Sequence, residues 1–268
     1  MIINYALQTY DIASNSCFDR YCTNNKKELV HKCVSSFLRS VRYAADHQPD
    51  YIHNVMVFDN GSTDETINLI KRAIDTLSYD NLKITLNRIN SGSMINSIRA
   101  CYEWLRDTNG DVIYLVQDDY LYTEDGIFQM IDVFFQFYNE TKHFPLIYSF
   151  NTPDHWKTQY RLRSTPRMIY PGKRQYWIQN YDISCAFMTH RKQLQRNWHW
   201  IKYFMSIDQV KGLNGTGALE NVSLNKIMVD EKVLGLVPFE SVGLHMQAER
   251  EKEPYVDWKK RWDSIQII

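Results

Sequence analysis

The stretch VMVFDNGSTDETINLI, residues 55–70, contains the clearest indication of the fold. Its apolar run, Val55 to Phe58, ends at Asp59-Asn60-Gly61-Ser62, which are residue types that tight turns favour. Acidic residues then open a segment whose apolar side chains recur at helical spacing: Ile67, Leu69, Ile70, Ala73, Ile74 and Leu77. The stretch therefore predicts a buried strand, a turn and a helix.

The same unit recurs on both sides of this stretch. Apolar strands are each followed by a segment of helical spacing, and we expect strands at 2–7, 82–86 and 112–116 with helices at 26–45, 91–105 and 123–138. Strands that alternate with helices predict right-handed crossovers and a mostly parallel sheet covered on both faces. The predicted class is α/β, with a central sheet flanked by helices.

From residue 146 the pattern changes to shorter strands with Pro- and Gly-containing connections. We expect these strands at 146–150, 167–170, 176–179 and 183–189, and helices at 191–205 and 219–229. A length of 268 residues fits one large α/β domain better than two. We therefore expect a single domain over residues 1–268, whose second half is a smaller mixed region.

The composition excludes several classes of partner. The chain has 31 Lys plus Arg and 31 Asp plus Glu, so no net charge attracts nucleic acid or an anionic membrane. Its five cysteines are spread out and form no CxxC pair, which argues against a zinc site or a disulfide framework and favours a reducing, cytoplasmic compartment. No stretch reaches the ~18 apolar residues that a transmembrane segment needs. The 14% of aromatic residues suits surfaces on which sugars stack.

Two acidic clusters directly follow predicted strands. Asp59 ends one strand, and Asp118 and Asp119 end another. Open parallel sheets bind ligands beyond the carboxyl ends of their strands, so we expect both clusters at one edge. Adjacent carboxylates repel unless a cation stabilises them, and a hard divalent ion would do this while also binding a diphosphate. The alternatives are a turn or helix cap for Asp59 and an exposed acidic turn for the pair.

Three segments carry a family resemblance. VMVFDNGSTDETINLI (55–70), NRINSGSMINSIRACYEWLRDTNGD (87–111) and GDVIYLVQDDYL (110–121) resemble the inverting family 2 glycosyltransferases of GT-A fold, the last of them at the DXD motif. The resemblance implies that Asp59 binds the nucleoside, that Asp118 lies near the ribose or the metal, and that Asp119 coordinates Mn²⁺ or Mg²⁺. Gln117 departs from the pattern, because the family often has an acid there. The second half of the chain is similar to the family only loosely.

The resemblance also implies contacts to the nucleotide and the metal from other segments. At the end of the first strand, Thr9, Tyr10 and Asp11 are candidate contacts to the base, with a plain strand end as the alternative. His245, in VGLHMQ, is similar to a late histidine that closes the metal or diphosphate site, and a structural histidine is the alternative. One local excess of basic residues would suit the donor's phosphates: Arg161, Arg163, Arg167, Lys173 and Arg174.

An inverting transfer needs a base that takes the proton of the acceptor hydroxyl. The family uses an acid of a pair that opens a helix, and the nearest match is Ala218-Leu219-Glu220-Asn221, where Asn replaces the second acid. Glu220 is therefore the candidate base, with Asp208 and Glu231 as rivals, and an ordinary first-turn acid stabilised by the helix dipole is the alternative. The segment DISCAFMTHRKQL (182–194) resembles the strand that passes beneath the donor sugar.

Taken together, the resemblance implies a metal-dependent transfer of a sugar from a nucleotide-diphosphate sugar, by family habit a UDP-sugar, with inversion. Residues 1–120 would bind the nucleotide sugar and residues 121–268 the acceptor, which is a glycan, a lipid-linked molecule or a protein. The alternative is a catalytically silent nucleotide- or glycan-binding module, which Gln117 and Asn221 favour. A nucleotidyltransferase or a dehydrogenase would need a Gly-rich loop after a strand, and the chain lacks one.

Overall fold

The computed structural model describes residues 1–268 except 13–19, 152–166, 183, 207–219, 221 and 247–254. Its centre is a nine-stranded sheet whose strands lie, from one edge to the other, in the order β3 (Leu82–Arg88), β2 (Ile52–Asp59), β1 (Ile2–Thr9), β4 (Val112–Gln117), β9 (Met188–His190), β6 (Leu146–Ile147), β10 (Gly235–Pro238), β8 (Tyr176–Asn180) and β7 (Ile169–Pro171). A separate two-stranded ribbon pairs β5 (Tyr120–Tyr122) with β11 (Gly243–His245).

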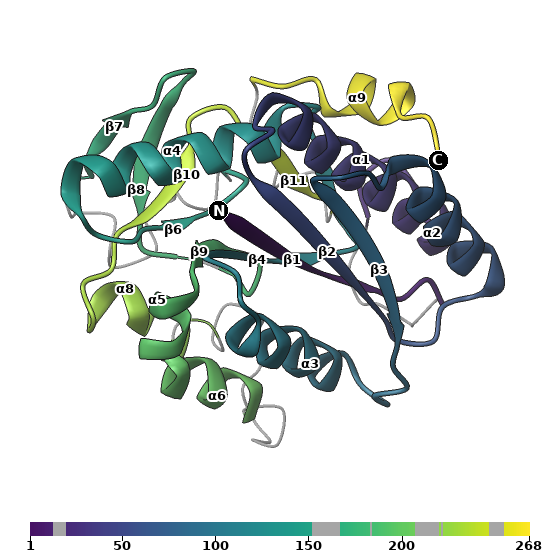
Figure 1. Cartoon of the computed structure of the whole chain (residues 1–268), viewed down its shortest axis with the longest axis horizontal. Coiled ribbons are helices and arrows are strands. Elements are labelled where there is room, and N and C mark those ends of the chain that lie inside the picture. The colour runs from purple at the N-terminus through teal and green to yellow at the C-terminus, as the bar shows by residue number, and fades with distance from the viewer. Residues whose placement is uncertain (13–19, 152–166, 183, 207–219, 221, 247–254) are drawn as a thin grey trace.

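Helices cover both faces of the sheet (Figure 1). One layer contains α1 (Lys26–His47), α2 (Asp64–Leu77) and α4 (Gly126–Thr141), and the other contains α3 (Met94–Asp107), α5 (Arg191–Arg196) and α6 (Trp198–Ser206). Strands β3, β2, β1 and β4 are parallel, and helices connect them. The predicted α/β class, with its mostly parallel first half, is confirmed.

The second half of the sheet is mixed, and several of its boundaries differ from the predicted ones. Strand β9 is antiparallel to both β4 and β6, and β8 is antiparallel to β10. The helix predicted over 191–205 is two helices, because the Asn197 side chain donates to the carbonyl of Gln193 (2.9 Å) and ends α5 there. The prediction also lacked β5, β10 and β11, which are too short to show a period-two pattern.

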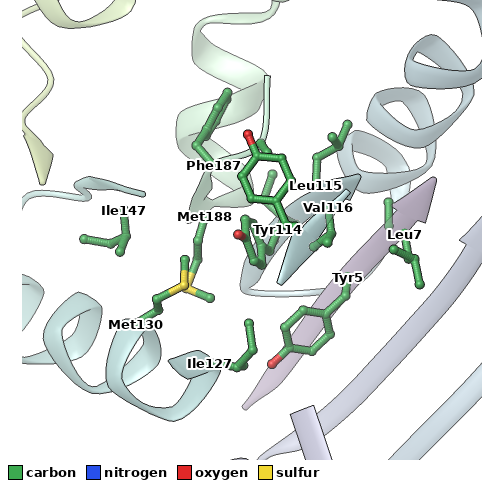
Figure 2. Close-up of a cluster of buried hydrophobic side chains, with 14 of the residues drawn as sticks. Tyr5, Leu7, Tyr114, Leu115, Val116, Ile127, Met130, Ile147, Phe187 and Met188 are labelled. Carbon is green, nitrogen blue, oxygen red and sulfur yellow. The ribbon is translucent and has the colours of Figure 1, made fainter. Parts of the chain in front are cut away.

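The core lies mainly around β1 and β4. Figure 2 shows their side chains packed with those of α4 and β9, and each labelled residue is at most 2% exposed: Tyr5, Leu7, Tyr114, Leu115, Val116, Ile127, Met130, Ile147, Phe187 and Met188. Both faces of these strands are buried, as their continuous apolar sequences predict. The strands therefore form a rigid base for the loops that follow their carboxyl ends.

A second, smaller cluster fixes the β5–β11 ribbon. Helix α9 (Trp258–Ser264) lies along α1 (Figure 1), and its Trp258 and Trp262 are buried with residues of α1 and of the ribbon: Leu29, Cys33, Leu121, Leu244 and Met246. The Nζ atom of Lys32 donates to the carbonyl of Trp262 (2.9 Å). The end of the chain therefore holds the ribbon against the start of α1. The described helices include none long and apolar enough to cross a membrane.

Candidate active site

Three loops that are distant in the sequence meet at the carboxyl end of β1. This strand lies between β2 and β4, so that Thr9 pairs with Asp59 in register and Gln8 pairs with Gln117. The Thr9 hydroxyl donates to Asp59 (3.2 Å), and the Tyr10 backbone N–H donates to Asp118 (2.5 Å). The structure thus brings both acidic clusters to one edge of the sheet, where open α/β sheets bind their ligands.

Asp59 lies inside the turn that follows β2. Its side chain is 0% exposed and accepts hydrogen bonds from the backbone N–H groups of Gly61 (3.2 Å) and Ser62 (3.2 Å), as well as from Thr9. Gly61 has a φ of 92°, a left-handed conformation that glycine adopts without strain. In this conformation the carboxylate orders the turn. Contact with a nucleoside stays a prediction.

Asp11 lies beside the start of α2. It is 3% exposed and accepts from the backbone N–H (2.9 Å) and hydroxyl of Thr63 and from the hydroxyl of Thr66. Burial acts to raise the pKa of Asp11, but these hydrogen bonds and Lys27 outweigh burial and lower it. Asp11 thus supplies acceptors to the first turn of α2, where backbone N–H groups lack helical partners. Of the three predicted base contacts, Thr9 is also buried and Tyr10 is half-buried.

Asp118 has a charged partner that sequence reasoning missed. The Nζ atom of Lys26 lies 2.7 Å from Asp118 Oδ1, and the two side chains are 13% and 10% exposed. The other oxygen, Oδ2, accepts from the Tyr10 N–H, so both oxygens of Asp118 are engaged. Burial acts to lower the pKa of Lys26, but the charges of Asp118 and Asp119 outweigh burial and raise it. A lysine in the first turn of a helix is unfavourable to the helix dipole, and that was the available signal for a specific anionic partner.

Asp119 pairs with His245 across the ribbon. His245 lies opposite Tyr120 in the β5–β11 register, and their rings stack at 4.8 Å. The His245 Nε2 atom lies 3.1 Å from Asp119 Oδ2. Asp119 Oδ1 is buried and has no hydrogen-bond partner among the described residues. Burial acts to raise the pKa of Asp119, but His245 and Lys26 outweigh burial and lower it to about 2, so this carboxylate is charged at neutral pH.

This pair fits the divalent ion that the sequence predicts. A carboxylate oxygen without a partner beside an imidazole nitrogen is a donor set that Mn²⁺ accepts, and Mg²⁺ is commonly held by one or two carboxylates plus substrate phosphates. The described residues contain no group of three or more His, Cys, Asp and Glu side chains that could hold a metal. Asp119 and His245 would therefore supply two of the ligands of a bound ion. The metal itself stays a prediction.

Glu220 faces the same region from the second half of the chain. Its Oε2 atom is buried without a hydrogen-bond partner among the described residues, and burial, with the charge of Asp182, raises its pKa to about 7. The thiol of Cys185 has a raised pKa because of burial and because of the charges of Glu220 and Asp119. Both carboxylates therefore lie within electrostatic reach of Cys185. A carboxylate of this pKa can accept a proton near neutral pH.

The two rival bases, Asp208 and Glu231, and the predicted basic residues are the remaining candidates from the sequence. Asp208 lies outside the described residues, as do Arg161 and Arg163. Glu231 lies 3.9 Å from the Nε2 atom of His199. Lys173 pairs with Asp132 (2.7 Å) and Arg174 with Asp125 (3.3 Å), which engages both cations with acids on or beside α4.

Gln117, which stands where the family often has an acid, is part of a neutral hydrogen-bond chain. Its Oε1 atom accepts from the Cys185 thiol (3.2 Å), and its Nε2 atom donates to Gln8 (3.4 Å). Gln8 in turn donates to the carbonyl of Met94 (3.3 Å). An amide can both donate and accept, so it links these groups without adding a third buried negative charge beside Asp118 and Asp119.

Comparison with known proteins identifies the family of this chain. The family described as glycosyl transferase family 2 matches residues 22–198, about two thirds of the chain. The chain belongs to glycosyl transferase family 2. The resemblance seen in the sequence is thus confirmed, together with the GT-A type of fold and the glycosyltransferase class. The matched range contains Lys26, Asp59, Asp118 and Asp119, whereas Glu220 and His245 lie beyond it.

Solved structures similar to this glycosyltransferase include two of S. aureus TarS. The structure of TarS residues 1–349 has a TM-score of 0.44 and 15% identity, over 74% of this chain and 49% of that one. A second TarS structure has the same TM-score and identity, over 74% of this chain and 30% of that one. The chain therefore spans about half the length, or less, of these structures. No curated protein matches it in sequence.

Two surface hollows of about 340 and 280 Å³ lie elsewhere, against α4. Their linings include Met1 and Asp111, or Gln48 and Tyr51, which precede the amino ends of the parallel strands. Of the predicted site residues, only Lys173 of the basic segment lines one of them, and it pairs there with Asp132. The candidate active site is therefore defined by its converging side chains and not by these hollows.

Proposed function

We propose that this glycosyltransferase moves a sugar from a nucleotide-diphosphate donor, a UDP-sugar by preference, to an acceptor hydroxyl with inversion, using Mn²⁺ or Mg²⁺. The observation that carries the proposal is the buried, unpartnered Oδ1 atom of Asp119 beside His245. A buried oxygen of an ionised carboxylate is costly to leave without a hydrogen bond or a cation, although the other oxygen of Asp119 is paired with His245. A divalent cation with a diphosphate is the ligand that its surroundings and family membership favour.

In this proposal Asp119 and His245 would hold the ion, whose positive charge would offset the negative charge of the leaving nucleotide diphosphate. Lys26 neutralises Asp118, so that Asp118 orients the Tyr10 backbone at the end of β1. The loops after β1 and β2, with Thr9, Tyr10, Asp11 and Asp59, would surround the nucleoside.

Glu220 is the proposed base. A single displacement with inversion requires that the acceptor hydroxyl lose its proton as its oxygen attacks the anomeric carbon. The raised pKa of Glu220, about 7, lets this half-buried carboxylate take that proton near neutral pH. Asp119, whose pKa is lowered to about 2, stays ionised throughout and cannot share the role. The two carboxylates thus have separate tasks because their environments shift their pKa values in opposite directions.

A catalytically silent nucleotide-binding module is the second candidate. The neutral hydrogen-bond chain from Gln8 through Gln117 to Cys185 favours it, because an amide occupies the position of a family acid. Hydrolysis of UDP-glucose and other nucleotide sugars, measured with and without Mn²⁺, separates the candidates. An enzyme releases UDP in a metal-dependent way, whereas a binding module releases none.

A thermal-shift experiment tests the nucleotide and metal together. UDP, UDP-glucose, UDP-N-acetylglucosamine and GDP-mannose would be added to the wild type and to Asp119→Ala, each with Mn²⁺ and with EDTA. We expect at least one ligand to raise the melting temperature of the wild type only with Mn²⁺, because a ligand that binds the native state stabilises it by mass action. Asp107→Ala is the matched control, since this aspartate is 62% exposed and its carboxylate pairs with Arg106. An equal shift in Asp119→Ala would remove Asp119 from the metal site.

A further inference from the structure

The end of β10 lies at the same edge of the sheet as the candidate active site. Strand β10 is parallel to β6, and β6 is parallel to β4 because each is antiparallel to β9. The carboxyl end of β10 therefore faces the same direction as those of β1 and β4. Phe239 is the first residue after β10, and it precedes His245 by six positions in the same segment of chain.

Three exposed aromatic rings gather at this point. The side chains of Phe239, Tyr255 and Tyr176, which we call the ring platform, are 39%, 54% and 60% exposed. The Phe239 N–H donates to the carbonyl of Tyr176 (2.9 Å) and so extends the pairing of β10 with β8, which places both side chains on one face of the sheet. The rings of Phe239 and Tyr255 lie 4.9 Å apart.

This degree of exposure is unusual within the molecule. Among the described residues only four Phe, Tyr or Trp side chains are exposed, and three of them form the ring platform; the fourth is Tyr203. Most of the other rings pack in the core or against one another. A contiguous group of exposed rings marks a binding surface more often than scattered single residues do.

The ring platform is also joined to the proposed metal ligands. The Asn151 side chain is 3% exposed and donates to the carbonyl of Phe239 (3.3 Å). Its neighbour Phe150 packs 5.7 Å from Tyr120 and 6.3 Å from His245, measured between ring centroids. The segment that presents Phe239 and the ribbon that presents His245 therefore share one buried support, which fixes the platform relative to the pair of Asp119 and His245.

We propose that the ring platform is an acceptor subsite that stacks on the apolar face of a neutral pyranose; this inference rests on the proposed function. The face of an aromatic ring is electron-rich and attracts the C–H groups of a sugar ring, while the tyrosine hydroxyls can bond to sugar hydroxyls. Glu240, exposed next to Phe239, disfavours an anionic or phosphorylated acceptor. The occupant is thus an uncharged sugar, either free or at the end of a glycan.

Binding of simple sugars tests the inference. Methyl β-D-glucopyranoside, methyl β-D-galactopyranoside and methyl 2-acetamido-2-deoxy-β-D-glucopyranoside would be titrated into the full chain with UDP and Mn²⁺ and followed by saturation-transfer difference NMR. We expect at least one to bind the wild type and to bind Phe239→Ala and Tyr255→Ala about tenfold more weakly, as loss of a stacking ring implies. Phe239→Tyr keeps the ring and should bind like the wild type. Tyr203→Ala, which removes an exposed ring from α6, is the matched control and should change nothing.

Affinity for UDP with Mn²⁺, measured by calorimetry on the same variants, keeps the two proposals apart. Unchanged UDP affinity with weakened sugar binding supports the ring platform, whereas a wild type that binds no UDP contradicts the proposed function itself. The acceptor subsite is overturned if UDP binds but no methyl glycoside does, or if Phe239→Ala binds the sugars like the wild type. It is equally overturned if sedimentation shows a dimer that Phe239→Ala dissociates, because the rings then bind a second copy of the chain.

Discussion

The turn after β2 and the turn after β4 both place aspartates at the same edge of the sheet, but the two turns treat their carboxylates differently. Asp59 is fully buried, and both of its oxygens accept hydrogen bonds from within the protein. Asp118 is held just as completely by Lys26 and the Tyr10 backbone. Asp119, its direct neighbour, keeps one buried oxygen without a partner among the described residues.

The difference shows that an acidic residue at a strand end is not by itself a sign of chemistry. When both oxygens of a buried carboxylate accept hydrogen bonds from the protein, these bonds stabilise the folded state. Such a carboxylate has a structural role. A carboxylate left incomplete in a buried site costs stability, and such a cost is more readily explained by a ligand than by folding. Substitution of an aspartate whose oxygens are all hydrogen-bonded should therefore lower stability. Substitution of Asp119, which has an oxygen without a partner among the described residues, should lower activity instead.

The largest effect on stability is expected at the Lys26–Asp118 pair. Lys26→Met leaves a buried carboxylate without its counter-charge, and we expect the free energy of unfolding to fall by about 3–5 kcal/mol. Urea denaturation would measure it. Lys27→Met is the control, because the neighbouring pair of Lys27 with Glu65 is exposed and its loss should change the stability little. Adding Asp118→Asn to Lys26→Met should restore much of the loss, and no restoration would mean that the pair is not coupled.

At Asp119 we expect a large loss of activity and a small loss of stability. Asp119→Asn removes the charge that would hold the cation, and we expect metal-dependent release of UDP from the donor to slow by about 10²–10³-fold, which is about 3–4 kcal/mol in the barrier. The free energy of unfolding should change by less than about 1 kcal/mol, because one oxygen of this carboxylate makes no hydrogen bond among the described residues. A variant that is strongly destabilised but fully active when folded would show that Asp119 belongs with Asp59 and Asp118.

The parallel half of the fold could be predicted because its signals are local. The apolar strand Val112 to Val116 and the turn at Asp59 are visible within a few residues, and the rule for parallel sheets then brings their ends together. The pairing of Asp119 with His245 depends instead on a ribbon of two three-residue strands, and Tyr122 and Gly243, which pair in it, are 121 positions apart. Sequence reasoning proposed Asp119 from its adjacent carboxylate and from the family resemblance, and His245 from the resemblance, but it did not predict that the two residues pair.

The hydrogen-bond partners of each carboxylate could not be predicted from the sequence, because they depend on tertiary contacts. Lys26 reaches Asp118 from a helix that begins 92 positions earlier, and Thr63 and Thr66 reach Asp11 across the start of α2. The sequence alone does not show whether an acidic side chain is bonded to such a partner or to solvent. This is why the sequence placed Asp11, Asp59 and Asp118 among the ligand contacts, whereas their hydrogen bonds give each of them a structural task as well.

An intermediate effect is expected at Asp59. Asp59→Asn keeps the shape of the side chain but sets an amide N–H₂ group against the donors of Gly61 and Ser62, and we expect the free energy of unfolding to fall by about 2 kcal/mol. Chemical denaturation of this variant beside Asp107→Asn, an aspartate 62% exposed on α3, provides the comparison. If Asp59→Asn is as stable as the wild type, the carboxylate does not order the turn, and a direct role in nucleoside binding gains support.

The smallest effect is a pH dependence, which tests whether Glu220 and not Asp119 limits the reaction. The base must be deprotonated, and the pKa of Glu220 is raised by burial to about 7, so kcat/KM for transfer should fall as pH decreases through 7. Between pH 8 and pH 6 we expect a loss of about tenfold, because most of the base is then protonated. The pKa of Asp119, about 2, lies far below this range, so Asp119 itself adds no titration to this pH profile. Glu220→Gln should abolish the acidic limb together with most of the activity, and a limb that persists unchanged in this variant would assign the titration to another group.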